Sequence, residues 1–513
     1  MLRRHKTTNS IQVNDMLVKT TLFAATLIAA FAQSSSLADV TIIEGRSISP
    51  PGASPVGANG RIYKLEVSPA KEVSPAFKHR FTVPPHETIA GNAITHYLRS
   101  FGERGLSRPW DYAEKESGGE VHDWYSLKTK SEDIPIEKLK QCSEVFATLV
   151  SHIDRATLCR DADWGYAIED LRGIETIGFL LPSVQNTRTM ARSLMLQNRL
   201  AIIEKRFDDS VDRLRMTYQL GRNVNKMGVL VSSLVGVAEV RMANEGAMLL
   251  IGTEGSPNLY WAFAELPTPF IDASRAMQID ISMAERLFPE IMDIENAKLS
   301  DDEWKRLLNK YVDQLPIISG LTGGSTYKNG LSMKAVGFLG SLTGYGDAKR
   351  RLTERGYDKE VVSKMSVAQV ILTDASHDIK YFSQMCSKSW HVPYPESRRI
   401  NKIFEDEIRR EQAKFRFGAI ISGMLGPAIL NVRFAVVRSE AQINLLMAIE
   451  SLRNHAAIHG KFPQSLTELD LPVRTNPITG KPFNYSLEAG KAVLTCDFQG
   501  DNGIHRYEIS IKN

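Results

Sequence analysis

The chain has 513 residues, of which 43% are hydrophobic and 24% are charged, a composition that excludes a disordered or collagen-like protein. Its formal net charge is +4, but residues 1–38 hold four basic residues and one acidic residue, which leaves 59 basic and 58 acidic residues in the rest. This balance excludes the basic surface typical of nucleic-acid-binding proteins. The length predicts several folding units, because single hydrophobic cores rarely extend beyond about 300 residues.

An apolar segment near the N-terminus predicts export. Leu22–Ala32 follows a lysine and leads to a small-residue cleavage motif that ends at Ala38. This run is shorter than the roughly 20 apolar residues that a membrane-spanning helix needs. We therefore expect residues 1–38 to be a signal peptide cleaved after Ala38, with the mature chain periplasmic or secreted; the alternative is a retained N-terminal membrane anchor. Met1 and Met16 are both candidate start residues.

The segment after the signal peptide has the composition of a linker. Residues 39–75 contain five prolines among Ser, Gly and Ala residues, a pattern typical of extended chain. Within it, Arg61–Val67 alternates apolar and polar side chains, which predicts one short strand.

Apolar residues recur at helical spacing through most of residues 76–417, which predicts a body of many helices. Ser183–Gly252 has the strongest pattern and predicts a helical hairpin, spaced like one tetratricopeptide unit, followed by a third helix. That third helix, Val229–Leu250, is apolar nearly all round and should be buried. In contrast, Gly102–Glu120 is polar and glycine-containing, which predicts a long surface loop.

Residues 418–513 predict a separate C-terminal module. A long helix extends from Gly418 to His459, and alternating residues then predict three short strands near Phe483–Leu487, Ala492–Cys496 and Arg506–Ile511. The predicted fold class is therefore mainly α: an irregular multi-helix, partly tetratricopeptide-like body, followed by a long helix and a small antiparallel β-sheet that form an α+β module.

This C-terminal stretch resembles the major pseudopilin of type II secretion, in which a long helix meets a G-x-[YF]-P-x-x-L turn, a P-x-[TN]-G-x-P-[FY]-x-Y motif and a small sheet. The matching residues are Gly460, Phe462, Pro463, Leu466, Pro477, Gly480, Pro482, Phe483 and Tyr485. A pseudopilin carries its apolar helix at the extreme N-terminus behind a processing site. In this chain the helix is internal, so the resemblance does not imply assembly into a pilus.

A second resemblance covers nearly the whole chain. It rests on Pro75–Arg80, Gly91–Ala93, Asp163–Gly165, the hairpin around Phe207, Arg355–Tyr357, Pro393–Pro395 and the pseudopilin-like end. These segments are similar to a family of uncharacterised exported helical proteins of planctomycete-type bacteria. The resemblance implies export and a helical architecture, and it supplies no catalytic residues.

Two groups of residues have the chemistry of a metal site. His455 and His459 stand four residues apart on one helix, the spacing at which two imidazoles can share a metal, but no acid follows His455 as in HExxH. The favoured interpretation is a pair of histidines stabilised by the helix C-terminus. In the loop at 497–503, Asp497, Asp501 and Asn502 offer oxygen ligands for calcium, but Asp-Asn-Gly is also an ordinary turn sequence, which we favour.

Two further groups suggest acid–base chemistry. Asp374 and Asp378 flank His377 and could orient its imidazole, although no nucleophile motif accompanies them. Asp161, Asp163 and Glu169 surround Trp164, the combination of acids and aromatic surface that a glycan site needs. The simpler interpretation, which we favour, is that Trp164 anchors a loop and the acids face water.

The four cysteines have no CxxC or zinc spacing, and we expect buried thiols, leaving open whether Cys142 and Cys159 form a bridge. The sequence therefore assigns no catalytic, cofactor-binding or metal-ligating residue and no cofactor. It predicts a non-catalytic exported envelope protein, a helical scaffold or interaction module whose partner is another envelope protein rather than nucleic acid. The alternative is an exported hydrolase acting on glycan or peptide.

Overall fold

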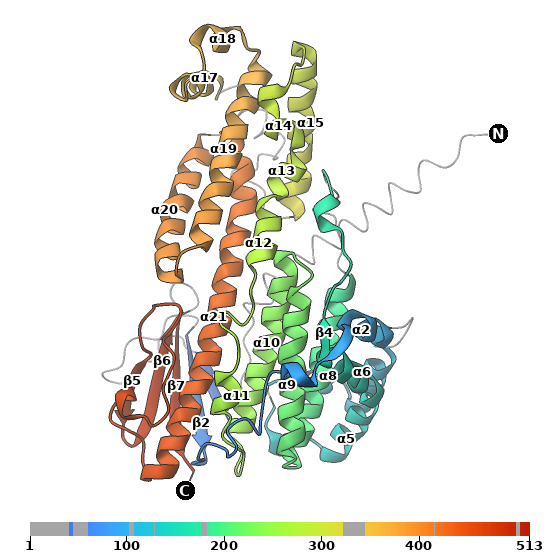
Figure 1. The fold of residues 1–513 in the computed structure, drawn as a ribbon, viewed down its shortest axis with the longest axis vertical. Coiled ribbons are helices and arrows are strands. Elements are labelled where there is room, and N and C mark those ends of the chain that lie inside the picture. The colour runs from blue at the N-terminus through green and yellow to red at the C-terminus, as the bar shows by residue number, and fades with distance from the viewer. Residues whose placement is uncertain are drawn as a thin grey trace, which may run out of the picture. The chain divides into compact units, whose positions relative to one another are not determined.

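A computed structural model describes residues 40–44, 60–101, 107–127, 129–173, 175, 182–321, 344–414, 416–498 and 503–512. The described residues form two compact units (Figure 1). The helical unit comprises those within Ala167–Leu181 and Ser274–Arg433, and the mixed unit comprises those within Ser34–Tyr166, Pro182–Ala273 and Phe434–Asn513. The predicted signal peptide and most of the loop at 497–503, predicted to be an ordinary turn, lie outside the described residues. The chain is mainly helical with a small sheet, as predicted, although the sheet is mixed and not purely antiparallel.

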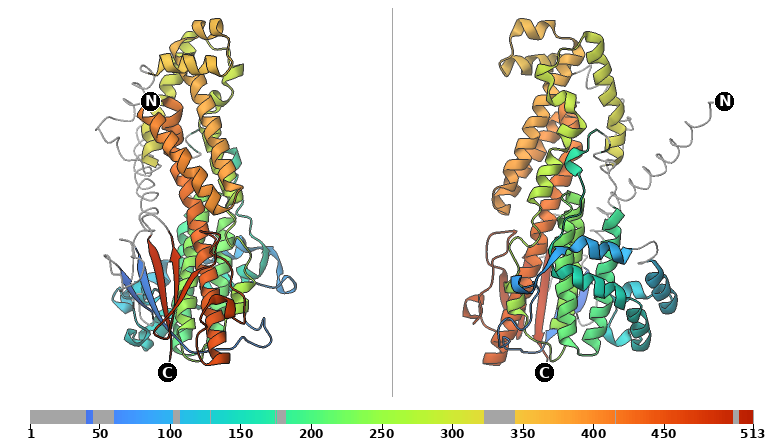
Figure 2. Two further views of the ribbon diagram at one scale, coloured as in Figure 1. Left: turned by 90° about the vertical axis from the view of Figure 1, so that its left-hand side faces the viewer. Right: turned by 45° about the vertical axis from the view of Figure 1, so that its right-hand side comes forward.

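The sheet of the mixed unit has five strands in the order β1-β2-β7-β6-β5, which lie side by side in Figure 2. Their bounds are β1 Val40–Glu44, β2 Arg61–Val67, β5 Asn484–Glu488, β6 Lys491–Asp497 and β7 Ile504–Ile511. The three predicted C-terminal strands pair antiparallel, but β2 adds to β7 in parallel, with Tyr63 opposite Tyr507. Arg61–Val67 is therefore the middle part of a sheet and not a strand isolated within a linker.

The inner strand β2 is buried mainly on one face. Ile62, Tyr63, Leu65 and Val67 are buried, whereas Lys64 and Glu66 between them are exposed, so the covered face is the one that carries Tyr63, Leu65 and Val67. The sheet therefore depends on two chain segments more than 430 residues apart, so the C-terminal strands do not form a module of their own.

The helices of the mixed unit are α2 Ala93–Phe101, α3 Ser107–Ser117, α4 Val121–Trp124, α5 Ile136–Glu144, α6 Ala147–Leu158, α8 Pro182–Ile203, α9 Phe207–Asn225, α10 Leu230–Ile251 and α11 Tyr260–Ala264. Short 3-10 turns are η1 Pro85–Glu87, η2 Ser131–Asp133 and η5 Leu466–Glu468, and β3 Ile89–Asn92 pairs with β4 Cys159–Asp161. The prediction of a long surface loop at Gly102–Glu120 is wrong for Ser107–Ser117, which form α3. Trp110, Ala113 and Ser117 recur on one face of that helix and are buried, a pattern that its charged residues obscure.

The predicted buried helix is confirmed as α10, which packs against α8 and α9. Val235 and Val240 are fully buried, whereas Leu234 is only partly buried. The α9–α10 contact is close at two glycines. A Cβ added at Gly221 would lie 2.9 Å from the Gly236 carbonyl oxygen, and one at Gly236 would lie 2.6 Å from the Gly221 oxygen. Only glycine permits this approach of the two backbones.

A fully buried ion pair joins three segments of the mixed unit. Glu450 and Arg453 both lie on α21 (Phe417–His459), and their side chains are 0% exposed. Arg453 Nη1 lies 2.8 Å from Glu450 Oε2. Arg453 also donates to the carbonyl oxygens of Ser68 and Ser256, and Glu450 accepts from the backbone of Leu259. Because each charge is paired and hydrogen-bonded, burial is tolerated, and the pair fixes the end of α21 against the segments that precede α2 and α11.

The helical unit comprises α12 Ser274–Ile281, α13 Met283–Leu287, α14 Pro289–Met292, α15 Asp301–Leu321, α17 Tyr345–Glu354, α18 Lys359–Lys364, α19 Val367–Trp390, α20 Tyr394–Ala413 and the first part of α21, with η3 Ile168–Asp170 and η4 Ile294–Asn296. Its main core surrounds Trp304, Tyr311 and Ile371. Asp358 and Ser366 cap the N-termini of α18 and α19. Of the helices described, none combines the length and apolar character that crossing a membrane requires.

Candidate functional site

The acids near Trp164 in the sequence belong to two different units. Trp164 is buried, donates from Nε1 to the Asn223 carbonyl at 2.8 Å and stacks between Tyr97 and Tyr166, so its ring faces are covered by protein. Asp161 and Asp163 are exposed, and Asp163 accepts from the Gly165 backbone. Glu169 belongs to the helical unit, where it pairs with Arg275. The structure supports the interpretation of Trp164 as a loop anchor.

Asp374 and Asp378 are held by arginines and do not orient His377. Asp374 accepts from Arg351 and Arg355, and Asp378 accepts from Arg355 and Arg416. The His377 ring points instead to the Tyr357 hydroxyl at 3.0 Å.

The charges of this cluster shift two pKa values. Burial and the neighbouring Asp374 raise the pKa of Asp378 to about 6, although Arg416 and Arg355 oppose the shift. Burial and Arg355 lower the pKa of His377. The cluster links α17, α19 and the start of α21 by ion pairs, which is a structural arrangement rather than a general base.

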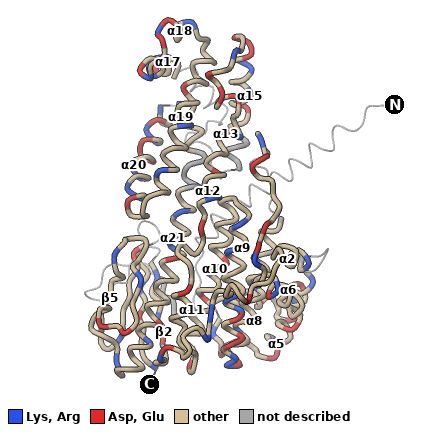
Figure 3. Tube along the Cα trace, viewed as in Figure 1, with Lys and Arg blue, Asp and Glu red and all other residues tan. Residues whose placement is uncertain are grey.

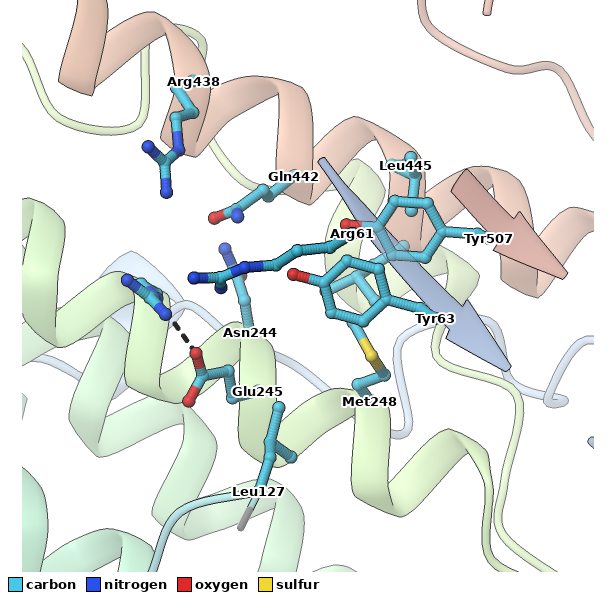
Figure 4. A pocket seen from close by; sticks show the side chains of 12 residues that line it. Arg61, Tyr63, Leu127, Asn244, Glu245, Met248, Arg438, Gln442, Leu445 and Tyr507 are labelled. Carbon is cyan, nitrogen blue, oxygen red and sulfur yellow. Dashed lines mark hydrogen bonds and ion pairs between the residues drawn. The ribbon is translucent and has the colours of Figure 1, made fainter. Parts of the chain in front are cut away.

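A small cavity of about 20 Å³ lies in the mixed unit between the sheet, α10 and α21 (Figure 4). Tyr63 and Tyr507 stack with ring centroids 4.5 Å apart, and their hydroxyls point into the cavity. Arg61, Arg241 and Arg438 also line it, and Arg241 pairs with Glu245 at 2.9 Å.

Positive charge dominates this cavity. Burial, together with Arg241, lowers the pKa of Arg438 to about 10. Asn244 accepts a hydrogen bond from Tyr218 through Oδ1, while its Nδ2 has no partner among the described residues. The volume admits about one water molecule, which would satisfy that amide. The sequence did not indicate this site, because its arginines come from three segments far apart in the chain.

A second, open cleft of about 540 Å³ lies at the start of α9. Its lining combines the basic residues Lys78, His79, Lys205 and Arg206 with the acids Asp208 and Asp209. His79 Nδ1 lies 3.6 Å from Asp208, and Arg206 pairs with Asp209. The cleft therefore has mixed charge and selects neither anions nor cations by its field.

The two histidines at the end of α21 meet a carboxylate that the sequence analysis did not identify. His455 Nδ1 lies 3.1 Å from Asp470 Oδ2, and His459 Nε2 lies 3.2 Å from Asp470 Oδ1. Slight burial tends to raise the pKa of Asp470, but the hydrogen bonds and charges of His459 and His455 outweigh it and lower that pKa. One feature of the sequence could have indicated this contact. Gly460 ends α21 and begins a turn, so the segment that follows, which contains Asp470, can run back along the end of that helix.

The cysteines are confirmed as free and buried, and Cys142 and Cys159 are not bridged. Comparison with known proteins adds no functional assignment, because no family model, no curated protein and no solved structure matches this chain.

Proposed function

We propose that this chain is an exported, non-catalytic envelope protein that acts as a helical scaffold and docks a partner protein through α19 and α20. The observation that carries the proposal is exposed apolar surface on these helices. Ile403 on α20 is 61% exposed and Tyr381 on α19 is 45% exposed. The Tyr381 ring lies edge-on to Phe404, and its hydroxyl donates to Glu407, one helical turn after Ile403. Both apolar side chains therefore border the same stretch of α20.

The supporting structure beneath this surface is suited to docking. Phe382, Cys386 and Phe404 form a small buried cluster between the two helices. The arginine–aspartate cluster around Asp374 and Asp378 fixes α19 against α17, so a partner would meet a preorganised surface. Acidic and basic residues occur in short groups along α20 (Figure 3), which favours a partner that places an apolar side chain over Ile403 among charged groups of both signs.

Photo-crosslinking in intact cells tests this proposal. A photoreactive residue at Ile403 should capture one partner protein reproducibly, whereas the same residue at Val361, an exposed apolar position on α18, should not. Ile403→Asp, combined with a crosslinker at Tyr381, should abolish the adduct while leaving the melting temperature unchanged, because the side chain is exposed. The proposal that α19 and α20 form a docking surface would be contradicted if Ile403 and Val361 gave identical adducts, or if neither position gave an adduct.

The alternative is an exported hydrolase acting on glycan or peptide. The group formed by His455, His459 and Asp470 favours it, because two imidazoles and a carboxylate are a ligand set of hydrolytic zinc sites. Turnover of a glycan or peptide panel by the zinc-loaded protein, lost in Asp470→Asn, would replace the scaffold proposal.

A further inference from the structure

We infer that His455, His459 and Asp470 form a binding site for a zinc ion at the C-terminal end of α21. The nitrogen and oxygen atoms that these residues offer all lie within 4.8 Å of one another. The inference does not depend on the docking proposal, because it concerns a different unit and different residues.

The distances fit a shared ion. The two N···O separations are 3.1 and 3.2 Å. They run to different oxygens of the Asp470 carboxylate, and the three ligand atoms all lie within 4.8 Å of one another. A tetrahedral zinc ion with bonds of about 2.1 Å places neighbouring ligand atoms about 3.4 Å apart, so side-chain rotation that brings the ligand atoms together by about 1 Å would let them bind it. The ion would take the place of the imidazole protons that now bridge to the carboxylate.

The chain holds Asp470 in place independently of any ion. Gly460 has φ +71°, which ends the helix and turns the chain back. Phe462 and Leu471 are buried on either side of the loop, and Ser451 Oγ donates to the Leu471 carbonyl at 2.6 Å. Since Ser451 lies one turn before His455, this bond positions Asp470 beside the histidine pair. A preorganised third ligand is what distinguishes the site from an isolated pair of helical histidines.

The electrostatic position also favours a cation. His459 lies in the last turn of α21, where the unpaired carbonyl groups carry the negative end of the helix dipole, and His455 lies one turn before it. His455 is buried, whereas His459 and Asp470 are exposed, so the inner ligand is shielded and the outer side of an ion would face solvent. Three protein ligands and an accessible fourth position describe a zinc site that keeps a water molecule.

The test is zinc titration into the full chain, purified without a histidine tag and freed of metal with a chelator. Isothermal titration calorimetry should show saturable binding of one zinc ion per chain, and zinc should raise the melting temperature. His459→Ala and Asp470→Asn should each weaken binding at least about tenfold. Both positions are exposed, so the variants should fold. The matched control is His86→Ala, which removes a histidine whose side chain is 79% exposed and should retain the parental affinity.

Cobalt substitution gives a second readout that does not depend on stability. The parent should develop the intense visible absorption of tetrahedral cobalt, and Asp470→Asn should lose it. Absence of saturable zinc binding in the parent, or unchanged affinity in either His459→Ala or Asp470→Asn, would overturn the inference and leave the three residues as a hydrogen-bonded tie between the helix and its loop.

Discussion

Glu239 makes the stability of the mixed unit depend on pH. Its side chain lies on α10 with 0% exposure, and neither carboxyl oxygen has a hydrogen-bond partner among the described residues. Burial raises the pKa of Glu239 to about 8, although the nearby Thr187 hydroxyl and Arg188 guanidinium oppose the shift. At neutral pH the folded protein therefore holds this carboxyl in its protonated form.

The magnitude follows from the difference between the folded and unfolded states. Below pH 4.5 both states are protonated, and the favourable contribution of the neutral buried group is complete. As the pH rises toward 8, the unfolded chain loses its proton while the folded chain keeps it, so the free energy of unfolding falls. Each pH unit in this window removes about 1.4 kcal/mol, which sums to roughly 5 kcal/mol as an upper figure.

Glu239→Gln removes this dependence, because the amide remains neutral at every pH. The free energy of unfolding of the variant should match that of the parent near pH 4.5 and exceed it increasingly up to pH 8, with no further change above. Urea unfolding at intervals from pH 4.5 to 9 measures the difference. Glu254→Gln, at an exposed acid just after α10, serves as the control and should leave the pH profile unchanged. A pH-independent difference, or a parent that gains stability over the variant as the pH rises, would show that Glu239 is ionised in the folded protein.

Three further predictions have defined outcomes. Arg453→Ala leaves the buried Glu450 charge unpaired and should lower the free energy of unfolding by about 3–5 kcal/mol in urea titrations, whereas a loss below about 1 kcal/mol would mean that the pair is not buried. Gly236→Ala forces α9 and α10 apart and should destabilise by about 1–3 kcal/mol, against little change for Gly346→Ala, where an added Cβ meets nothing within 4 Å. N-terminal sequencing of the envelope form should begin at Asp39, and recovery of residues 20–32 in an integral membrane fraction would replace export with anchoring.

Local sequence determined the features that depend on short-range periodicity. The burial of α10 could be predicted because its apolar residues surround the whole helix, and the strands β5, β6 and β7 could be predicted from alternation and turn residues. Helix α3 was missed because its buried face consists of one tryptophan and small residues among many charges, so the pattern of Trp110 and Ala113 carried too little contrast.

Tertiary structure alone decided which of these elements meet. Alternation in Arg61–Val67 indicates a strand but contains no information about β7 as its partner, because strand pairing depends on which distant segments the whole chain brings together. The same holds for the candidate zinc site. The spacing of His455 and His459 is visible in the sequence, but the third ligand, Asp470, arrives through a return of the backbone, which is fixed by buried Phe462 and Leu471 and by the Ser451 hydrogen bond. Periodicity is local, whereas the convergence of side chains is set by packing.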